Sequence, residues 1–242
     1  MASETLFISD LHLAPDRPGS LALALAFLGG RARGADRLYI LGDLFDAWIG
    51  DDDDSPFNLQ VIQALRRLTD QGTPVDFMAG NRDFLIGRRF ARATGCGLLP
   101  DPCLANLYGQ RTLLTHGDLL CSDDRDYQRF RRRVRNPLVR WLFLLRGLER
   151  RRAIAANYRR LSQTAMADKP LGIMDANQDT ICAYLRRYGS QRLIHGHTHR
   201  PAQHQFPLDG QTARRWVLAD WRETSGEVLV VSAAGTQVET LT

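Results

Sequence analysis

Five short polar motifs in this 242-residue chain place oxygen or imidazole ligands beside residues that permit sharp turns. Four of them carry a glycine next to the ligand residue, and glycine lets the backbone turn tightly. Ligands at positions i and i+2 share a face only on an extended chain or in a loop. The motifs are Asp10-Leu11-His12, Gly42-Asp43, Gly80-Asn81-Arg82-Asp83, His116-Gly117-Asp118 and Gly196-His197-Thr198-His199.

The types of residue in these motifs indicate a class of metal ion. Aspartate, asparagine and histidine together suit Mn²⁺, Fe²⁺ or Zn²⁺ better than Ca²⁺ or Mg²⁺, which prefer oxygen alone. Each motif taken singly is common by chance, and an exposed histidine pair is often only a solvated loop. Five in one chain, each following an apolar run, predict a metal site.

The apolar runs before the motifs predict the elements that position them. Strands are expected at residues 5–8, 37–41, 75–78, 111–115 and 191–194, with helices at 21–27 and 58–69. Residues 104–108 and 111–115 flank Gly109-Gln110 as a hairpin, and strands at 214–218 and 227–231 complete a sheet. Alternating strands and helices favour an α/β layered core with its site past the strand ends. We expect a sandwich of two sheets flanked by helices, with a helical insertion over one end.

Positive charge is concentrated in one segment. Lysine and arginine number 32 against 27 acidic residues, a formal net charge of +5, and the composition is ordinary for a globular protein. Residues 125–160 contain thirteen arginines against two acidic residues, which is +11, so the rest of the chain carries −6. Such a segment favours an acidic partner: nucleic acid, a phosphorylated small molecule or an anionic membrane surface.

Within this segment, residues 137–145 form an apolar block interrupted by Arg140. The block is too short to span a bilayer. It suits a groove for acyl chains or a position at a membrane interface between its basic flanks. An ordinary amphipathic helical hairpin with a solvated arginine face explains the same pattern.

Several other features carry secondary predictions. The four cysteines include no close pair, so neither a redox motif nor a zinc knuckle is expected, and reduced thiols fit a cytosolic protein. Residues 1–9 lack the pattern of a signal peptide. The acidic run 51–54 is interpreted as a solvated turn. His195 is expected in the core, holding His197 or His199 in place, and His204 on the surface.

The ordered set of motifs resembles the calcineurin-like metallophosphoesterase superfamily, whose pattern is D-x-H, G-D, G-N-H-[DE], H and G-H-x-H. The resemblance covers residues 5–43, 75–118 and 191–235. It implies the two-sheet fold and hydrolysis of a phosphate ester or anhydride by water activated between two metals. It also implies one metal held by Asp10, His12, Asp43 and His199, and a second held by Asp43, Asn81, His116 and His197.

Arg82 departs from the superfamily pattern, which usually has histidine at that position. Arginine stays protonated and cannot act as a general acid. It is better suited to hold phosphate oxygens as charge builds. This favours a leaving group that is already stable as an anion, such as a phosphate in a pyrophosphate. Arg82 pairing with Asp83 is the structural alternative.

Longer matches resemble the UDP-2,3-diacylglucosamine pyrophosphatase family of lipid A biosynthesis. The resemblance implies cleavage of that nucleotide lipid to UMP and 2,3-diacylglucosamine 1-phosphate (lipid X), with water attacking the α-phosphorus and two Mn²⁺ per subunit. The catalytic residues would be Asp43, Asn81, Arg82 and His116. The matching segments are residues 7–13, 38–53, 80–90, 116–118 with 121 and 123–124, 173–175 with 177, and 194–201.

The same resemblance extends to substrate, location and domain organisation. It implies a monomer bound peripherally at the cytoplasmic face of the bacterial inner membrane, with no nucleic-acid partner. Residues 1–242 are expected to form one domain, with 123–188 as a helical insertion that caps it. The family often has asparagine at position 166. The substrate contacts implied are Asn81, Arg82, Asp124, Ser162, Met166, Lys169 and His197.

Two other functions are compatible with parts of the sequence. A metallophosphoesterase acting on nucleic acid or cyclic nucleotides would use the arginine-rich segment to bind phosphates. However, these arginines flank a Trp/Leu/Phe block rather than alternating with aromatic residues that stack on bases. A non-enzymatic scaffold is the third possibility, although a scaffold has no chemical need for all seven ligand positions.

Overall fold

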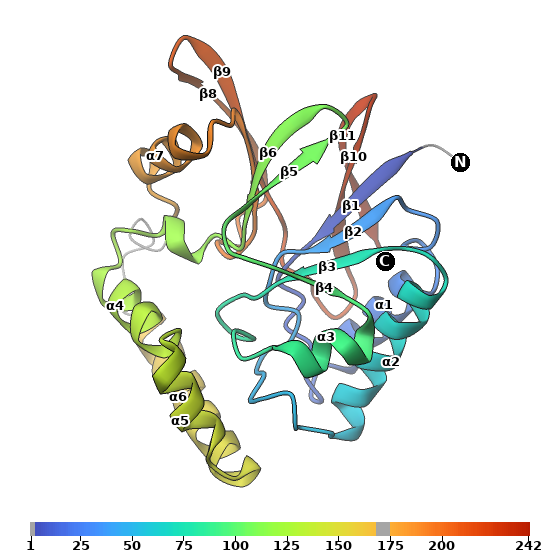
Figure 1. Ribbon diagram of the computed structural model, residues 1–242, viewed down its shortest axis with the longest axis vertical. Helices are drawn as coiled ribbons and strands as arrows, with labels where there is room; N and C mark the ends of the chain where they lie inside the picture. The colour runs from blue at the N-terminus through green and yellow to red at the C-terminus, as the bar shows by residue number, and fades with distance from the viewer. Residues whose placement is uncertain (1–2, 168–174) are drawn as a thin grey trace.

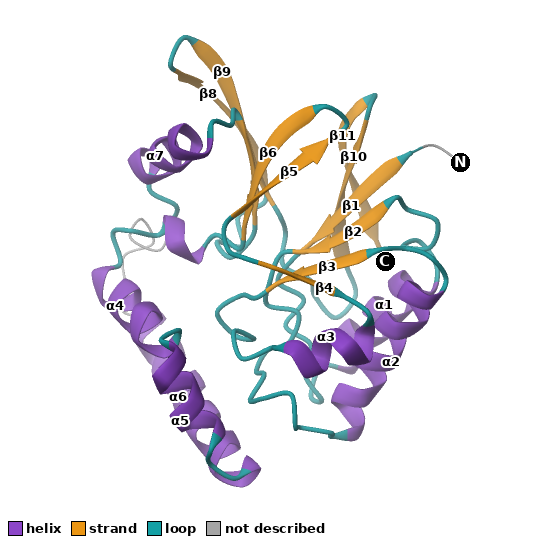
Figure 2. Ribbon diagram, in the orientation of Figure 1, coloured by secondary structure: helices purple, strands orange, loops and turns teal. Residues whose placement is uncertain are grey.

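The computed structural model describes residues 3–167 and 175–242, with side chains described for 3–160 and 175–242. Two mixed sheets face each other (Figures 1 and 2). The first has the order β11 (Gly235–Leu241), β10 (Gly226–Ser232), β1 (Glu4–Ile8), β2 (Arg37–Ile40), β3 (Val75–Met78) and β4 (Gly97–Leu99). The second has the order β5 (Cys103–Leu107), β6 (Gln110–Thr115), β7 (Arg192–His195), β9 (Gln211–Val217) and β8 (Ala202–Leu208).

The alternation of side chains along the central strands builds two apolar layers. Leu6 and Ile8 of β1 belong to the cluster that contains the helices packed on the first sheet. Phe7 points the other way and stacks on Tyr39 of β2 between the sheets, with ring centroids 4.9 Å apart. Because both faces of these parallel strands are buried, the strands read as continuous apolar runs in the sequence.

Helices cover the outer faces of both sheets. α1 (Pro18–Gly29), α2 (Pro56–Asp70) and α3 (Arg88–Thr94) pack on the first sheet, and α1 and α2 each begin with proline, which is preorganised for a first helical turn. On the second sheet, α7 (Gln178–Tyr188) is capped by Asn177 and buries Ile181 and Leu185. The predicted sandwich of two sheets flanked by helices is confirmed.

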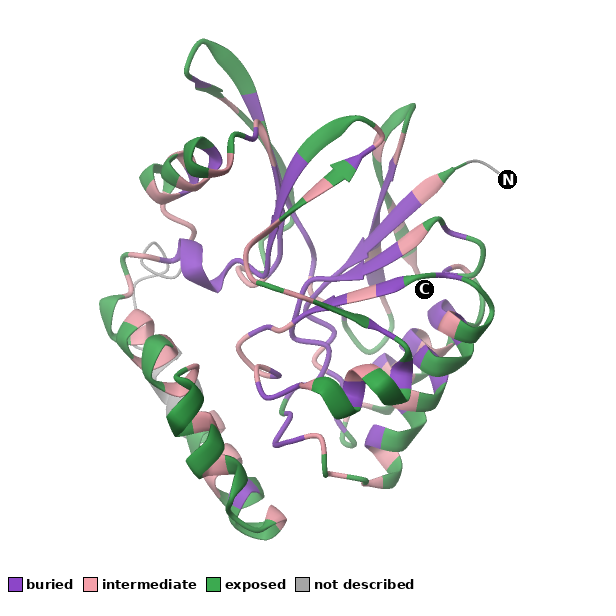
Figure 3. Cartoon of the chain, viewed as in Figure 1, coloured by how far each residue is buried: buried purple, intermediate pink, exposed green. Residues whose placement is uncertain are grey.

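Three further helices extend as an arm away from the sheets (Figure 1). They are α4 (Arg125–Val134), α5 (Pro137–Leu144) and α6 (Leu148–Ala167). Most of the arm is exposed, in contrast to the central strands β1, β2 and β3 (Figure 3). Arg151 of α6 is an exception, because it is 2% exposed, donates to the Ile49 carbonyl at 2.8 Å and pairs with Asp52. The arm is therefore fixed to the core by at least one buried cation.

The predicted strands and helices are all found, with ends shifted by a few residues. The sequence analysis did not predict α3, β4, β8 or β11. The first two are only seven and three residues long. β8 is an edge strand that is mostly exposed and contains Pro207, so it lacks the apolar pattern of a central strand.

The interpretation of residues 51–54 as a solvated turn is confirmed in part: residues 51–52 form a turn and Asp52 and Asp54 are exposed, but all four carboxylates have protein partners. Asp51 accepts hydrogen bonds from the backbone N–H groups of Gly87, Arg89 and Phe90, and so caps α3 from a distant loop. The next three acidic residues all form ion pairs. The pairs are Asp52–Arg151, Asp53–Arg152 and Asp54–Arg89.

Replacing Asp51 with alanine should lower the free energy of unfolding by about 2 kcal/mol. The variant loses the acceptor for the first turn of α3 and for the Trp48 indole N–H. Urea denaturation followed by circular dichroism measures the change. Asp54→Ala is the matched control, because it breaks only an exposed ion pair and should change stability by less than about 0.5 kcal/mol. Equal effects of the two substitutions would contradict the capping role.

Candidate metal centre

The five polar motifs converge at one edge of the sandwich. Asp10 and Asp43 follow β1 and β2, and their loops are joined by a hydrogen bond from the Asp10 N–H to the Gly42 carbonyl at 3.1 Å. His116 follows β6, and its carbonyl accepts from the Gly196 N–H at 2.8 Å, which joins the loops after β6 and β7. Parallel pairing of these strands brings their carboxyl ends to the same place.

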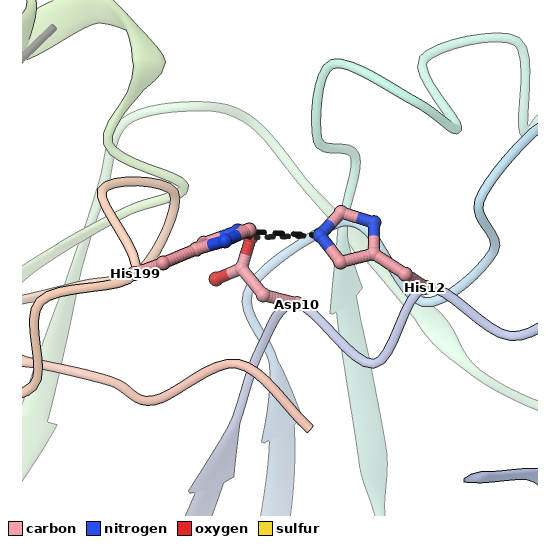
Figure 4. Close-up of side chains that lie close together, drawn as sticks. All are labelled: Asp10, His12 and His199. Carbon is pink, nitrogen blue, oxygen red and sulfur yellow. Dashed lines mark hydrogen bonds and ion pairs between the residues drawn. The ribbon is translucent and has the colours of Figure 1, made fainter. Parts of the chain in front are cut away.

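A first cluster of candidate ligands contains Asp10, His12 and His199 (Figure 4). The Nε2 atoms of the two histidines are 3.2 Å apart, and His199 Nε2 is 3.3 Å from Asp10 Oδ1. One potential ligand atom from each residue lies within 4.8 Å of the others. Such spacing is compatible with three ligands that share one cation.

A second cluster contains Asp43, His116 and His197, again within 4.8 Å of one another. His116 Nε2 lies 3.8 Å from Asp43 Oδ1 and 3.0 Å from Asn81 Oδ1. The rings of His116 and His197 are 5.0 Å apart. The structure thus brings all four residues predicted for the second metal into one group.

Asp43 belongs to the second cluster and also faces the first. Its Oδ2 is 4.0 Å from His12 Nδ1, and its Oδ1 is 3.8 Å from His116 Nε2. The two oxygens of one carboxylate therefore point toward different clusters. A ligand that bridges two metals requires this placement, and the bridging role itself stays a prediction.

The backbone at the site is strained. Seven described residues other than glycine have positive φ, and five of them are predicted ligands: Asp10, His12, Asp43, His197 and His199. This conformation costs non-glycine residues free energy, and it tends to occur where function requires a particular side-chain direction. Its concentration here indicates that the loops are shaped to aim these side chains inward.

Two glycines allow the loops to approach closely. A Cβ atom at Gly80 would collide with the Asp43 carboxylate, and one at Gly196 would collide with Ser9 and the Asp10 carboxylate. Only glycine fits at these positions, so the glycines in both motifs serve the packing of the site.

Burial keeps two of the histidines neutral. It lowers the pKa of His12 to about 3 and that of His197 to about 4, in both cases against the opposing effect of Asp10. Imidazole binds a metal through a neutral ring nitrogen, so both side chains are in the form a ligand requires. The Nδ1 atom of His12 is buried and has no hydrogen-bond partner among the described residues.

The carboxylates at the site are buried close together, and this changes the pKa of Asp43 and of its neighbour His116. Burial, with the charges of Asp83 and Asp10, raises the pKa of Asp43 to about 7. Burial alone would lower the pKa of His116, but Asp43 and Asp10 outweigh it and raise that pKa to about 9. A cation beside these carboxylates would relieve their repulsion. The mixed nitrogen and oxygen donors, the orphaned His12 nitrogen and the crowded carboxylates all fit divalent metal ions.

Asp83 organises the loop that carries Asp43. Its buried carboxylate accepts from the backbone N–H groups of Gly80 and Leu44 at 2.8 Å each, with longer bonds from Asp43 and Phe45. The alternative in which Asp83 pairs with the Arg82 guanidinium is not observed. Asp83 instead fixes the backbone beside two predicted ligands.

Arg82 and Asp124 are predicted substrate contacts with described side chains. The backbone N–H of Arg82 donates to Asp43 Oδ1 at 2.8 Å, while no hydrogen bond from its guanidinium is found among the described residues. Asp124 caps α4 by accepting from the Tyr127 N–H at 3.0 Å. Arg82 thus lies at the metal centre, and Asp124 lies at the start of the arm.

The remaining predicted contacts cannot be placed. Lys169 lies outside the described residues, and the side chains of Ser162 and Met166, on the last turns of α6, lie outside the described side chains.

The other two histidines agree with the sequence analysis in location. His195 is fully buried, and its Nδ1 contacts the Gly196 carbonyl at 2.9 Å, so its contact is with the loop backbone rather than with the ring of His197 or His199. His204 is exposed on β8.

The sequence analysis missed Tyr127, whose ring stacks on His197 with centroids 6.0 Å apart. Tyr127, Arg131 and Arg135 follow one another at intervals of four residues and so share one helix face, and this spacing is the sequence feature that could have pointed to Tyr127.

Comparisons with known proteins agree with this geometry. The calcineurin-like phosphoesterase family matches residues 4–201. The UDP-2,3-diacylglucosamine hydrolase of Edwardsiella ictaluri is 55% identical, covering 96% of this chain and 89% of that protein. The enzyme of the same name from Escherichia coli O81 is 50% identical, covering 95% of each chain.

Solved structures support the fold. An archaeal phosphodiesterase superposes with a TM-score of 0.50 over 98% of this chain and 99% of its own, at 11% identity. The ordered motifs, their convergence and the sequence similarity lead to one assignment. The chain belongs to the calcineurin-like phosphoesterase family and, within it, to the family of UDP-2,3-diacylglucosamine hydrolases.

Proposed function

We propose that this chain hydrolyses UDP-2,3-diacylglucosamine to UMP and 2,3-diacylglucosamine 1-phosphate. Relatives with that hydrolase name are 50–55% identical over nearly the whole chain. The observation that carries the proposal is the pair of three-residue clusters, in which Asp43 of the second cluster also faces His12 of the first. Hydrolysis of a phosphoanhydride is a reaction that two adjacent cations support.

Two Mn²⁺ ions are the cofactors we propose. Asp10, His12, Asp43 and His199 would hold one, and Asp43, Asn81, His116 and His197 would hold the other. When bound, the pair lowers the pKa of a water molecule and stabilises the attacking and leaving oxygens. The mixed nitrogen and oxygen donors favour Mn²⁺ over Mg²⁺.

The reaction forms one bond and breaks one. The oxygen of water bonds to the α-phosphorus of the UDP group, and the bond from that phosphorus to the bridging oxygen breaks. The bridging oxygen leaves with the β-phosphate, which becomes the 1-phosphate of the sugar lipid. UMP carries the new oxygen.

The protein contributes charge and orientation to this step. The backbone N–H of Arg82 donates to Asp43, which holds this residue at the site. Its guanidinium has no hydrogen-bond partner among the described residues and is available to bind phosphate oxygens as negative charge builds on them. Because arginine does not give up its proton, the leaving group must depart as an anion, as a phosphate does. His116 is oriented by the Leu41 carbonyl at 2.9 Å and faces Asn81.

The helical arm supports binding of the lipid part of the substrate. We infer that residues 123–188 are an insertion in a single domain and act as a cap. A cavity of about 330 Å³ lies between six apolar residues of the core and two arginines of the arm, and most of its accessible surface is polar. Cationic groups beside apolar residues suit the anionic head of a lipid at the point where its acyl chain begins. Its lining includes Phe77, Phe84, Ile86, Leu98, Arg135 and Arg140.

The arm also supports a peripheral membrane location. Leu138, Trp141 and Leu145 of the α5 region are 62%, 56% and 64% exposed, and arginines flank them. Exposed apolar groups between basic residues favour an anionic bilayer surface, here the cytoplasmic face of the bacterial inner membrane. Among the described helices, none has both the length and the apolarity to cross a bilayer. We propose that the chain works there as a monomer.

No observation favours a nucleic-acid substrate over this one. Arg131, Arg151 and Arg159 of the basic segment form ion pairs with Asp118, Asp52 and Asp46 of the core. Arginines engaged in this way are not available to follow a phosphate backbone.

A metal-depleted assay tests the proposed function directly. Adding Mn²⁺ back to the metal-free protein should restore release of UMP and 2,3-diacylglucosamine 1-phosphate from the diacylated substrate, with little release from its deacylated analogue. Mass spectrometry in ¹⁸O-labelled water should place the label in UMP. Label in the sugar phosphate, or no turnover of the diacylated substrate, would contradict the proposal.

Replacing both Trp141 and Leu142 with aspartate should raise KM for the diacylated substrate about ten-fold or more, because apolar contacts with lipid are lost. Hydrolysis of the small soluble diester bis(p-nitrophenyl) phosphate should change less than two-fold. Val238→Asp, at an exposed apolar position on β11, is the matched control and should leave both activities intact. Equal loss on both substrates would mean that α5 has only a structural role.

A further inference from the structure

One face of α4 is directed at the metal centre rather than at solvent. Tyr127, Arg131 and Arg135 are spaced by four residues, so they project from the same side of the helix and its C-terminal cap. The three side chains converge on Asp118, which lies two residues after His116 and is completely buried.

Asp118 is the shared partner of this face. Its Oδ2 accepts from the Tyr127 hydroxyl at 2.8 Å, from Arg131 Nε at 2.7 Å and from Arg135 at 3.5 Å. Its backbone carbonyl accepts from Gln128 Nε2 at 2.7 Å. Three residues of α4 and its C-terminal cap therefore hold Asp118 through hydrogen bonds or ion pairs.

The first connection from this face leads to the loop of His116. Arg131 also donates to Asp101 Oδ2 at 3.0 Å, so its guanidinium joins two buried carboxylates. The other oxygen of Asp101 accepts from Thr115 Oγ1 at 2.6 Å and from the His116 N–H at 3.3 Å. Arg131 thus pairs with Asp101, which accepts from the His116 N–H, and with Asp118, which follows His116 by two residues.

Two more connections reach the other loops of the second cluster. Arg135 donates to the Gly80 carbonyl at 2.9 Å, directly before Asn81. The Tyr127 ring stacks on the ring of His197 at an interplanar angle of 28°. One helix therefore contacts the loops that carry His116, Asn81 and His197.

Breaking these contacts would destabilise the protein. Asp118 and Asp101 are buried carboxylates, and replacing Arg131, whose guanidinium lies between them, with a neutral residue would leave uncompensated charge in the interior. Groups that orient the ligands of a metal typically change metal affinity by about 10–100-fold when they are lost.

We propose that Asp118 is a positioning residue and that the face formed by Tyr127, Arg131 and Arg135, here called the α4 brace, sets the spacing of His116, Asn81 and His197. The arm would then hold the second cluster in place as well as bind lipid. The effect on turnover rests on the proposed function, whereas the effect on metal affinity and on loop protection does not.

The test compares Asp118→Asn, Arg131→Gln and Tyr127→Phe with Asp126→Asn, whose side chain is on the same helix but 82% exposed. Titration of the metal-free proteins with Mn²⁺, followed by EPR, should give at least ten-fold weaker binding at one of two sites for Asp118→Asn and Arg131→Gln. Hydrogen exchange of the metal-free proteins should speed up at least ten-fold in residues 115–120. Asp126→Asn should match the parent protein.

Two further results make the inference falsifiable. Arg131→Lys should lose less Mn²⁺ affinity than Arg131→Gln, because the charge between the carboxylates is kept. Tyr127→Phe keeps the ring and covers the case in which Asp118→Asn does not fold; it should weaken one site measurably. Folded variants with Mn²⁺ affinity and exchange within two-fold of the parent would overturn the brace. Failure of the parent protein to cleave the nucleotide lipid would contradict only the proposed function.

Discussion

Replacing Asp43 with alanine should abolish turnover, lowering kcat by about 10³-fold or more. This carboxylate lies between both ligand clusters, with one oxygen toward His12 and the other toward His116. Its loss would remove a ligand from each site and the group that fixes their separation, which costs more than a single donor to the transition state. Steady-state hydrolysis of the diacylated substrate at saturating Mn²⁺ measures the effect.

The controls separate this role from general damage. Asp70→Ala removes an exposed carboxylate that pairs with Arg66 on the same helix, and it should leave kcat unchanged. The Asp43 variant should also bind fewer than two Mn²⁺ ions per chain while keeping its circular dichroism spectrum. Activity near that of the parent protein would refute the bridging role.

Arg82→Ala should lower kcat by about 10²-fold while KM changes by less than about three-fold. The backbone N–H of Arg82 donates to Asp43 at the candidate metal centre, and its guanidinium has no hydrogen-bond partner among the described residues. We expect this guanidinium to bind phosphate oxygens most strongly when charge builds in the transition state. Arg82→Lys should recover only part of the rate, because lysine offers a point charge in place of a planar pair of donors.

Arg88→Ala, at an exposed arginine six residues further along, is the matched control and should have no effect. A large rise in KM with unchanged kcat for the Arg82 variant would mean that the residue binds substrate and transition state equally. An unchanged rate would assign Arg82 to structure alone.

The central strands and the ligand loops could be predicted because their signals are local. The strand 5–8 is apolar on both faces, as a buried parallel strand must be, and Asp10 follows two residues after its end. Each ligand motif follows such a strand within a few residues, so parallel pairing brings together the motifs of each sheet, and the packing of the two sheets brings the two groups together. The positive φ of Asp43 and His197 required the structure, because side-chain type does not fix that conformation.

Other features depend on contacts between distant residues and were therefore missed. α3 is short and rich in arginine, and it is capped by Asp51 from 36 positions earlier. The acidic run 51–54 is typical of a solvated turn in the sequence, and its ion pairs with Arg151 and Arg152, about 100 residues later, required the structure. Asp118 and Tyr127 are nine residues apart, and only the fold shows that a helical arm returns to the ligand loops.

The partner of the excess arginines also could not be predicted from the sequence. Net charge predicts an acidic partner, but for several arginines the partner is a carboxylate of the same chain. Those ion pairs fix the arm to the core. The apolar side chains of α5 remain exposed, and their association with lipid stays a prediction.

Mn²⁺ stoichiometry in the metal-free protein tests the central claim most directly. EPR-monitored titration should show two ions bound per chain, with a signal from spin coupling between ions about 3.5–4 Å apart. Asp43→Ala should eliminate the coupling. Folded parent protein that binds one ion or none, or two ions without coupling, would contradict a shared two-metal centre built from these seven side chains.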